Sequence, residues 1–556
     1  MAFIQSLCLT KQKQMMMIKF KQLKNQFLIL FLVFSFWDAN AQNIDFKCNS
    51  LIKQNSIKAE FDFFSSDWFE GREAGEKGND LAADYLASIF KQIGLLPFNL
   101  SKNPKIDKRY YYSQSGDYFQ NIPFYRYTVS EKELLTIITN SNETQKQNSF
   151  KFSDDFWFVH SIAAENIEIN APVVFVGYGI SDLNNGYDDY KDIDVKGKIV
   201  VFLIGYPGYK DTTSIAYKKL NYTGNTWAIE GKKFKTAKQK GAIAALRFNT
   251  TEEWLIPKNI YRYNYKDYEG DVPPAERSYY NIAYDSISKS IPIVAISSRI
   301  ANELTNKTDV NILQFENNAS QNFKTASKLL NSKIVHFKIS TNSEMIKSQN
   351  IIAYIQGEIS NEFIIVGAHY DHLGKQNGFI YNGADDNASG TIAVVSIARA
   401  FREMKIKPKR SIIFALWTAE EKGLLGSEYF VKNWDNDKIN SYFNFDMISR
   451  YNQNDSANIL EINYTKNFKN INEVITNYNN NDLFKLKIRF KPQDLPDGDT
   501  DFYSFGIKGI PICGFFTGLH SDYHRFSDHS DKANIEDLTK IINLGFLTVW
   551  GIANNK

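Results

Sequence analysis

The sequence predicts an α/β protein built from a three-layer αβα domain, with a mostly parallel central sheet, and a smaller β-rich insertion. Three observations support this prediction. From Asn350 onward, strand-like apolar runs alternate with helix-like segments, which is typical of a sheet covered by helices. Between about residues 172 and 315, β-branched runs are bounded by glycine and proline, as in a β-rich module. The chain has 556 residues, of which 43% are hydrophobic, so it is long enough for more than one core.

The expected elements follow in order along the chain. Leu81 to Leu96 has apolar residues at helical spacing and predicts an amphipathic helix. In the insertion we expect strands at 171–180, 197–208 and 291–297, and a helix followed by a strand within 232–249. In the C-terminal part we expect strands at 350–357, 363–370, 411–417, 442–448 and 510–516, separated or followed by helices at 391–404, 423–434, 470–479 and 535–552.

The N-terminus has the features of a secretory signal peptide. Lysines precede an apolar run from Phe27 to Trp37, and Ala39-Asn40-Ala41 follows as a small-residue cleavage site. We expect cleavage after Ala41 and a secreted or periplasmic protein. The apolar run is too short to span a bilayer comfortably, so we expect no stable membrane span after cleavage. The alternative is an uncleaved anchor.

Charge and cysteine content bear on the possible partners. With 65 basic and 62 acidic residues, the net charge is only +3, which gives no reason to expect nucleic acid as a partner. Cys48 and Cys513 would be able to pair in an oxidising compartment. However, Cys513 lies in the apolar run GIPICGFF, where a lone cysteine more often acts as a small buried hydrophobe. The sequence does not indicate the oligomeric state.

Acidic and histidine side chains follow the expected strands of the C-terminal part. The residues after the ends of parallel strands gather at one edge of the sheet, where α/β proteins build their sites. Each residue alone also has a structural explanation: Asp386 would cap the next helix, Asp446 would be a buried acid and His524 a loop histidine. Five segments at or near the strand ends carry such residues, and together they indicate one site. The candidate residues are His369 and Asp371, Asp386, Glu420 and Glu421, Asp446, and Tyr523 and His524.

The types of these side chains indicate a metal. Mixed histidine and carboxylate ligands without thiolates suit catalytic Zn²⁺, which keeps a position open for water. Two imidazoles and three carboxylates are too many for one such ion, but they divide over two zinc ions per chain if one carboxylate bridges them. A pair of ions needs a base to take the proton of the attacking water. The glutamate of the pair Glu420-Glu421 that does not bind metal would supply it.

Several motifs resemble those of the secreted co-catalytic zinc aminopeptidases, relatives of glutamate carboxypeptidase and the transferrin receptor. These are GAHYDH, NGADDNASG, WTAEEKGLLGS, NFDM and DYH. The stretch SSDWFEGREAGEKGNDLAADYLASIF resembles the N-terminal segment of the family, and FVGYGI with YDDYKDIDVKGKIVVFL resembles the protease-associated domain that many members insert. We therefore expect a signal peptide at 1–41, the N-terminal part of the peptidase domain at 42–165, an inserted protease-associated domain at 166–315 and the zinc peptidase domain at 316–556.

The resemblance implies a role for each site residue. His369 and Asp446 would bind one zinc, Glu421 and His524 would bind the other, and Asp386 would bridge them. Glu420 would be the general base and acid. Asp371 would accept the other ring N–H of His369. Tyr523 would stabilise the oxyanion, as a tyrosine does in some relatives, or would only pack as an aromatic ring.

The sequence also departs from the family pattern. Arg525 and Phe526 stand where relatives often have a small residue and proline, which suggests an altered rim of the substrate pocket. Phe502 stands where histidine is common, and Asp501 beside it is a candidate supporting acid. Arg450 would orient substrate or, as the simpler interpretation, pair with an acid.

The resulting hypothesis is an exopeptidase that removes N-terminal residues from peptide substrates. A carboxypeptidase or dipeptidase on the same scaffold is the main alternative. A glutaminyl cyclase would use a single zinc, and a non-catalytic binding module like the transferrin receptor would lack ligands. The full set of five candidate ligands and the base disfavours both of these.

Overall fold

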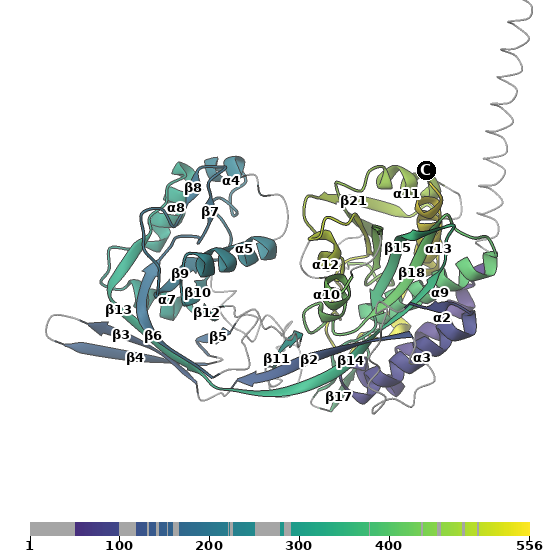
Figure 1. The fold of residues 1–556 in the computed structure, drawn as a ribbon, viewed down its shortest axis with the longest axis horizontal. Coiled ribbons are helices and arrows are strands. Elements are labelled where there is room, and N and C mark those ends of the chain that lie inside the picture. Colours follow the sequence, from purple (N-terminus) through teal and green to yellow (C-terminus); the bar gives the residue numbers. More distant parts are fainter. Residues whose placement is uncertain are drawn as a thin grey trace, which may run out of the picture.

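The computed structural model describes residues 51–98, 118–129, 133–140, 144–152, 154–158, 166–220, 222, 226–250, 278–282, 291–376, 378–434, 438–452, 458–480, 484–496 and 500–555. These residues form two lobes joined by a pair of long strands (Figure 1). The expected signal peptide and Cys48 lie outside the described residues. Within the described ranges, no helix is long and apolar enough to cross a membrane.

The larger lobe is built on a ten-stranded sheet. The four neighbouring strands β18, β15, β19 and β22 at the centre of the sheet are parallel to one another. On one side of them, the successive pairs β11–β2, β2–β14 and β14–β18 are antiparallel. The predicted α/β class is confirmed, and the parallel region is the centre of a mixed sheet. In spatial order the strands are β11 (Ser278–Ile282), β2 (Phe119–Val129), β14 (Thr341–Ile355), β18 (Arg410–Trp417), β15 (Ile359–His369), β19 (Lys438–Phe445), β22 (Ile512–Phe516), β20 (Ile459–Thr465) and β21 (Lys487–Gln493), with β1 (Leu96–Pro97) paired to β14.

Helices cover both faces of this sheet because successive side chains of a strand point to opposite faces. On β14, Ile351 and Ala353 belong to one apolar core, and Ile352 belongs to another. The first core is shared with α2 (Gln54–Phe64), α3 (Lys77–Ile93), α9 (Gly390–Met404), α11 (Ile471–Asn479) and α13 (Ile535–Asn554). The second is shared with α10 (Leu425–Lys432) and α12 (Phe502–Gly506). The lobe therefore has three layers, and the N-terminal helices α2 and α3 are part of it.

The smaller lobe has its own eight-stranded sheet and its own core. Its parallel strands β6, β9, β10 and β12 correspond to the β-branched runs of the expected insertion. The sheet extends beyond the expected range of 166–315 on both sides. Its members are β4 (Gln145–Lys151), β3 (Leu134–Asn140), β13 (Lys328–Ile339), β6 (Ile167–Phe175), β9 (Ile199–Leu203), β10 (Ala244–Phe248), β12 (Ile293–Ile296) and β5 (Phe156–Phe158).

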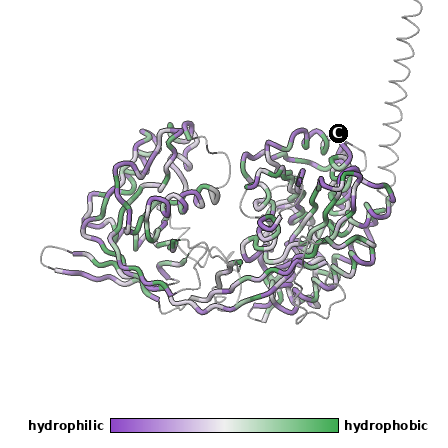
Figure 2. The backbone as a smooth tube through the Cα atoms, viewed as in Figure 1, coloured by the Kyte–Doolittle hydropathy of each residue, from purple (hydrophilic) through white to green (hydrophobic). Residues whose placement is uncertain are grey.

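The two lobes are connected through β2 and β14. These long antiparallel strands pair from Val129 with Thr341 to Phe119 with Ile351, and their far ends lead directly into the smaller lobe (Figure 1). Hydrophobic stretches occur in both lobes and alternate with hydrophilic ones (Figure 2), as expected for two separate cores. The smaller lobe is therefore carried on a two-stranded extension of the larger sheet.

Candidate metal centre

The predicted site residues come together at one edge of the larger sheet. His369 ends β15, Glu420 and Glu421 follow the end of β18, and Asp446 follows the end of β19. Parallel strands end at the same edge, so these side chains meet there. Asp386 lies in the buried turn Ala384–Ser389 that precedes α9. The loop after β22 brings His524 to the same place.

Asp386 lies between two histidines. Its Oδ1 atom is 3.4 Å from Nε2 of His369, and its Oδ2 atom is 3.2 Å from Nε2 of His524. The first histidine is also 3.4 Å from Oδ1 of Asp446, and the second is 3.3 Å from Oε2 of Glu421. Ligand atoms at the corners of a tetrahedral zinc site with bonds of about 2.0–2.1 Å lie about 3.3 Å apart. All four separations fit that spacing.

The two neighbouring glutamates occupy different environments. Glu421 is in contact with His524, whereas Oε2 of Glu420 is 4.0 Å from the nearest histidine nitrogen, Nε2 of His369. The possible ligand atoms of His369, Glu420 and Asp446 nevertheless lie within 4.8 Å of one another. Glu420 is thus beside the candidate ligands His369 and Asp446. However, its distance of 4.0 Å from His369 is longer than the spacing between two ligand atoms of one tetrahedral site.

The pKa values of the two glutamates move in opposite directions. Burial raises the pKa of Glu420 well above its ordinary value, and Glu421 and Asp501 raise it further although His369 opposes them. Burial would also raise the pKa of Glu421, but His524 and His372 lower it to about 2. A carboxylate that stays ionised suits a metal ligand, and one that holds a proton readily suits an acid–base group.

Asp371 fixes the segment that carries both glutamates. Its Oδ1 accepts a hydrogen bond from the backbone N–H of Glu420 at 3.1 Å, and its Oδ2 accepts one from the N–H of Glu421 at 3.4 Å. Nδ1 of His369 is 3.2 Å from the backbone carbonyl oxygen of Asp371 and 3.8 Å from its carboxylate. The nearer partner of the ring N–H is therefore the backbone of Asp371, and its side chain orients the glutamates.

His372 is a residue of the site that the sequence reasoning missed. Its Nδ1 is 2.8 Å from Oε1 of Glu421 and 3.7 Å from Oδ2 of Asp386, and these three residues also form a possible metal-binding group. The ring is fully buried. Its position three residues after His369, within the same motif, was the available signal. The contact orients Glu421 and accounts for part of its low pKa.

Tyr523 stacks on the predicted ligand His524, with ring centroids 3.8 Å apart. Burial raises the pKa of Tyr523 well above its ordinary value, and the nearby carboxylates of Asp386 and Glu421 raise it further. Its hydroxyl therefore stays protonated and is able to donate a hydrogen bond. The ring packing and a donor role are compatible.

The residues that depart from the family pattern have clear contacts. Arg450 donates to Asp522 at 2.7 Å and lies 3.6 Å from Asp528, which agrees with the simpler interpretation that it pairs with acids. Phe526 stacks on Phe379 of the hairpin formed by β16 (Gly374–Gln376) and β17 (Phe379–Tyr381), with centroids 4.6 Å apart. Asp501 is fully buried, and burial raises its pKa to about 7.

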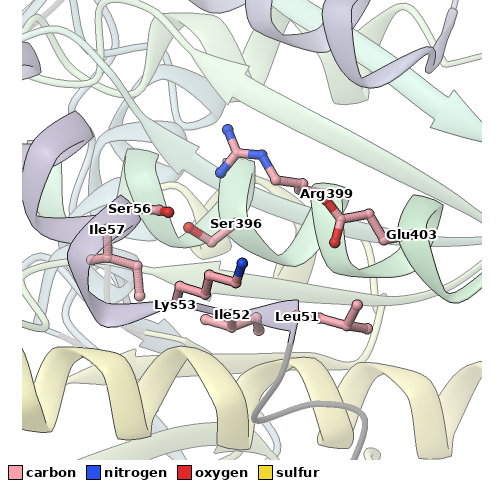
Figure 3. Close-up of a pocket in the computed structure, with 8 residues that line it drawn as sticks. All are labelled: Leu51, Ile52, Lys53, Ser56, Ile57, Ser396, Arg399 and Glu403. Atoms are coloured by element: carbon pink, nitrogen blue, oxygen red, sulfur yellow. The ribbon is translucent and has the colours of Figure 1, made fainter.

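A polar cavity of about 150 Å³ lies elsewhere in the larger lobe. It is formed between the start of α2 and one side of α9, and Ser396, Arg399 and Glu403 contribute to its lining (Figure 3). No predicted site residue is among its lining residues. Cys513 is buried in β22 and has no disulfide partner among the residues that the structure describes.

Comparisons with known proteins show which family and which relatives this chain resembles. Residues 350–547 match the model of peptidase family M28. Aminopeptidase Y of Saccharomyces cerevisiae is 31% identical over 194 residues, which is 34% of this chain and 34% of the yeast protein. The glutamate carboxypeptidase 2 homolog of Caenorhabditis elegans is 24% identical over 327 residues, covering 52% of this chain and 38% of that protein. This chain thus spans about a third of the length of the curated relatives it matches.

A solved structure resembles the whole fold. The aminopeptidase from Aneurinibacillus sp. strain AM-1 has a TM-score of 0.53 and 19% identity, and the match covers 92% of this chain and 97% of that one. The match supports the α/β fold, and the histidine–carboxylate cluster is a candidate metal site within it. The resemblance to peptidase family M28 extends over residues 350–547 of the chain.

Proposed function

We propose that this protein is a zinc-dependent aminopeptidase that hydrolyses the N-terminal residue of peptides. The observation that carries the proposal is the position of Asp386, whose two oxygens lie 3.4 Å and 3.2 Å from Nε2 atoms of two different histidines. One carboxylate shared by two histidine–carboxylate groups is the arrangement that a pair of metal ions requires. His369 and Asp446 would hold one zinc, Glu421 and His524 the other, and Asp386 both.

The donor set fits zinc. The side chains are imidazoles and carboxylates, and their spacings match a tetrahedral site. His369 and Asp386 are buried, and Asp446 and His524 are partly exposed. Zinc bound here would polarise the scissile carbonyl and lower the pKa of the attacking water. Among the chain's own groups, Glu420 accepts the proton of that water and delivers it to the leaving amine. The bond from its backbone N–H to Asp371 holds it in place.

Tyr523 completes the proposed site. Its phenol is protonated because its pKa is raised by burial and by neighbouring carboxylates. A hydroxyl held beside the ligand His524 is able to donate to the oxygen that becomes negative when water adds to the carbonyl. We propose this donor role for Tyr523.

The main alternative is a carboxypeptidase, the activity named in the C. elegans relative. Such an enzyme needs a cation that binds the C-terminal carboxylate of the substrate. Arg450, the arginine nearest to Asp446 in sequence, is 8% exposed and already pairs with Asp522 and Asp528. Because Arg450 is already paired with these acids, the aminopeptidase is favoured. Aminopeptidase is also the activity named for the yeast relative.

We also propose that the smaller lobe is a protease-associated domain and that the protein is secreted or periplasmic. The motif FVGYGI and the strand pattern of 171–208 support the first part of this proposal. The basic, apolar and small-residue pattern of 1–41 supports the second.

The test compares hydrolysis of aminoacyl anilides that have a free or an N-acetylated amine, and measures the zinc content of the same preparation. We expect cleavage of the free substrate only and two zinc ions per chain. Equal cleavage of both substrates would refute the aminopeptidase proposal. A single zinc per chain at full activity would refute the two-metal centre.

A further inference from the structure

Arg72 lies far from the metal-binding motifs in sequence but behind the metal centre in space. It is the last residue of the short helix η1 (Asp67–Arg72), which precedes α3, and its side chain is fully buried. A buried arginine needs partners for several N–H groups, since an unpaired buried charge is costly. The partners of Arg72 are all backbone carbonyl oxygens.

Three of those carbonyls belong to the two segments that carry predicted ligands. The fourth belongs to Phe64 of α2, which accepts from a terminal nitrogen at 3.3 Å. The Nε atom donates to the carbonyl of Tyr370 at 2.8 Å, directly after His369. The two terminal nitrogens donate to the carbonyls of Asn382 at 2.6 Å and Gly383 at 2.8 Å, just before the turn with Asp386. One rigid guanidinium thus holds the chain at the base of both segments.

The helix η1 adds further contacts to the same segments, one through the backbone of Arg72 and one through the side chain of Asp67. The N–H of His372 donates to the carbonyl of Arg72 at 3.2 Å, and the side chain of Asn382 donates to Asp67 at 2.7 Å. Gly71 has a positive φ of 71°, and a Cβ there would lie 2.5 Å from the carbonyl oxygen of Gly374. Only glycine therefore lets η1 approach the hairpin this closely.

Arg72 is also a cation in an acidic environment. Burial lowers its pKa to about 10, but Asp371, Asp386, Asp528 and Glu421 oppose this effect, so the side chain is charged at neutral pH. This positive charge stabilises the carboxylates when no metal is bound, and by itself it would repel Zn²⁺. Its charge and its hydrogen bonds therefore have opposite effects on zinc affinity, which makes them separable by experiment.

We propose that Arg72 is a positioning residue of the metal centre, which sets the separation of His369 and Asp386 through the carbonyls of Tyr370, Asn382 and Gly383. The N-terminal segment is then part of the metal site, although it lies outside the family match at 350–547. This inference rests on the proposed zinc centre but not on peptidase activity. Zinc binding tests it even if no anilide is cleaved.

The test uses the full chain with Arg72→Lys, which keeps the charge and loses the planar fork, and Arg72→Gln, which loses both. We expect the zinc affinity of both variants to fall about 10–100-fold, the usual effect of removing a group that orients metal ligands. Zinc affinity is measured by competition with a chelator. The visible spectrum of the cobalt-substituted protein is expected to change because the ligand geometry changes.

Arg247→Lys is the matched control. Arg247 is also buried, at 3% exposure, but it lies in the smaller lobe beside Glu230. Its replacement is expected to lower thermal stability without changing zinc affinity or the cobalt spectrum. If Arg247→Lys reduced zinc affinity as much as Arg72→Lys does, the effect would reflect general destabilisation and the proposal would be wrong.

Two further outcomes decide the remaining cases. An unchanged or higher zinc affinity in Arg72→Lys, which keeps the charge and loses only the planar fork, would overturn the positioning role. If the Arg72 variants do not fold, Asp67→Ala is used, because Asp67 is exposed and reaches the same segment through Asn382. We expect a smaller loss of zinc affinity in this variant, and an unchanged affinity would then count against the proposal.

Discussion

Replacing Glu420 by glutamine removes one carboxylate from the candidate centre and keeps the size of the side chain. The nearest histidine nitrogen is 4.0 Å from Glu420, compared with 3.2–3.4 Å for the contacts among the predicted ligands. Because this distance exceeds the tetrahedral spacing of about 3.3 Å, we expect Glu420→Gln to keep both zinc ions.

The expected loss in this variant is catalytic. A positioned general base contributes about 10²–10⁴-fold to a rate, which corresponds to about 3–5 kcal/mol of transition-state stabilisation. We therefore expect kcat on a free aminoacyl anilide to fall by that factor, with little change in KM. A residual rate above the uncatalysed one would come from the remaining site.

Glu421→Gln is the matched comparison, since it makes the same chemical change one residue away. Glu421 contacts His524 at 3.3 Å and His372 at 2.8 Å, so its replacement is expected to reduce the zinc content to about one ion per chain. Zinc is measured by elemental analysis after dialysis, in parallel with kcat. If Glu420→Gln lost zinc and Glu421→Gln kept it, the roles of the two glutamates would be reversed.

Three other predictions concern metal linkage and the buried thiol. Burial would lower the pKa of His524, but Glu421 and Asp386 raise it to about 10. Because zinc needs the neutral ring, zinc affinity should rise with pH by up to about tenfold per unit. Calorimetry in two buffers should detect proton release at pH 7. An affinity that is independent of pH would contradict this. Zinc at about 1,000 times its Kd should stabilise the fold by roughly 4 kcal/mol. A chelator should therefore lower Tm and abolish activity, and added zinc should restore both. An unchanged Tm would mean that the folded chain binds no zinc. Burial raises the pKa of the Cys513 thiol, so in a Cys8→Ser, Cys48→Ser variant it should react with a thiol reagent only after unfolding; rapid reaction of the native protein would show that β22 is accessible.

Much of the fold and of the candidate site was predictable from local sequence pattern. The strands β15, β18, β19 and β22 each contain a buried, mostly apolar run, and such runs alternating with helices predict a parallel sheet. Once the strands are known, the rule that parallel strands end at one edge brings His369, Glu421 and Asp446 together. This inference needs only residue order, because each ligand lies within a few residues of a strand end.

The extent of the smaller lobe was not predictable in this way. Its sheet pairs β3 with β13, for example Leu135 with Phe337, across about two hundred residues of sequence. Pattern identifies a strand but not its partner when the partner is so distant. For the same reason, the expected zinc peptidase domain at 316–556 includes Lys328–Ile339, although this segment is a strand of the smaller sheet, between β3 and β6.

The sequence by itself determined which elements this protein has and which side chains stand at the strand ends, because both depend on short-range periodicity and on the geometry of parallel strands. Only the tertiary structure decided how those side chains share the centre. It placed the two oxygens of Asp386 against two different histidines, set His372 against Glu421 and buried Arg72 behind both ligand segments. These contacts join residues up to 311 positions apart. Their geometry arises from packing several segments against one another, and no local pattern records it.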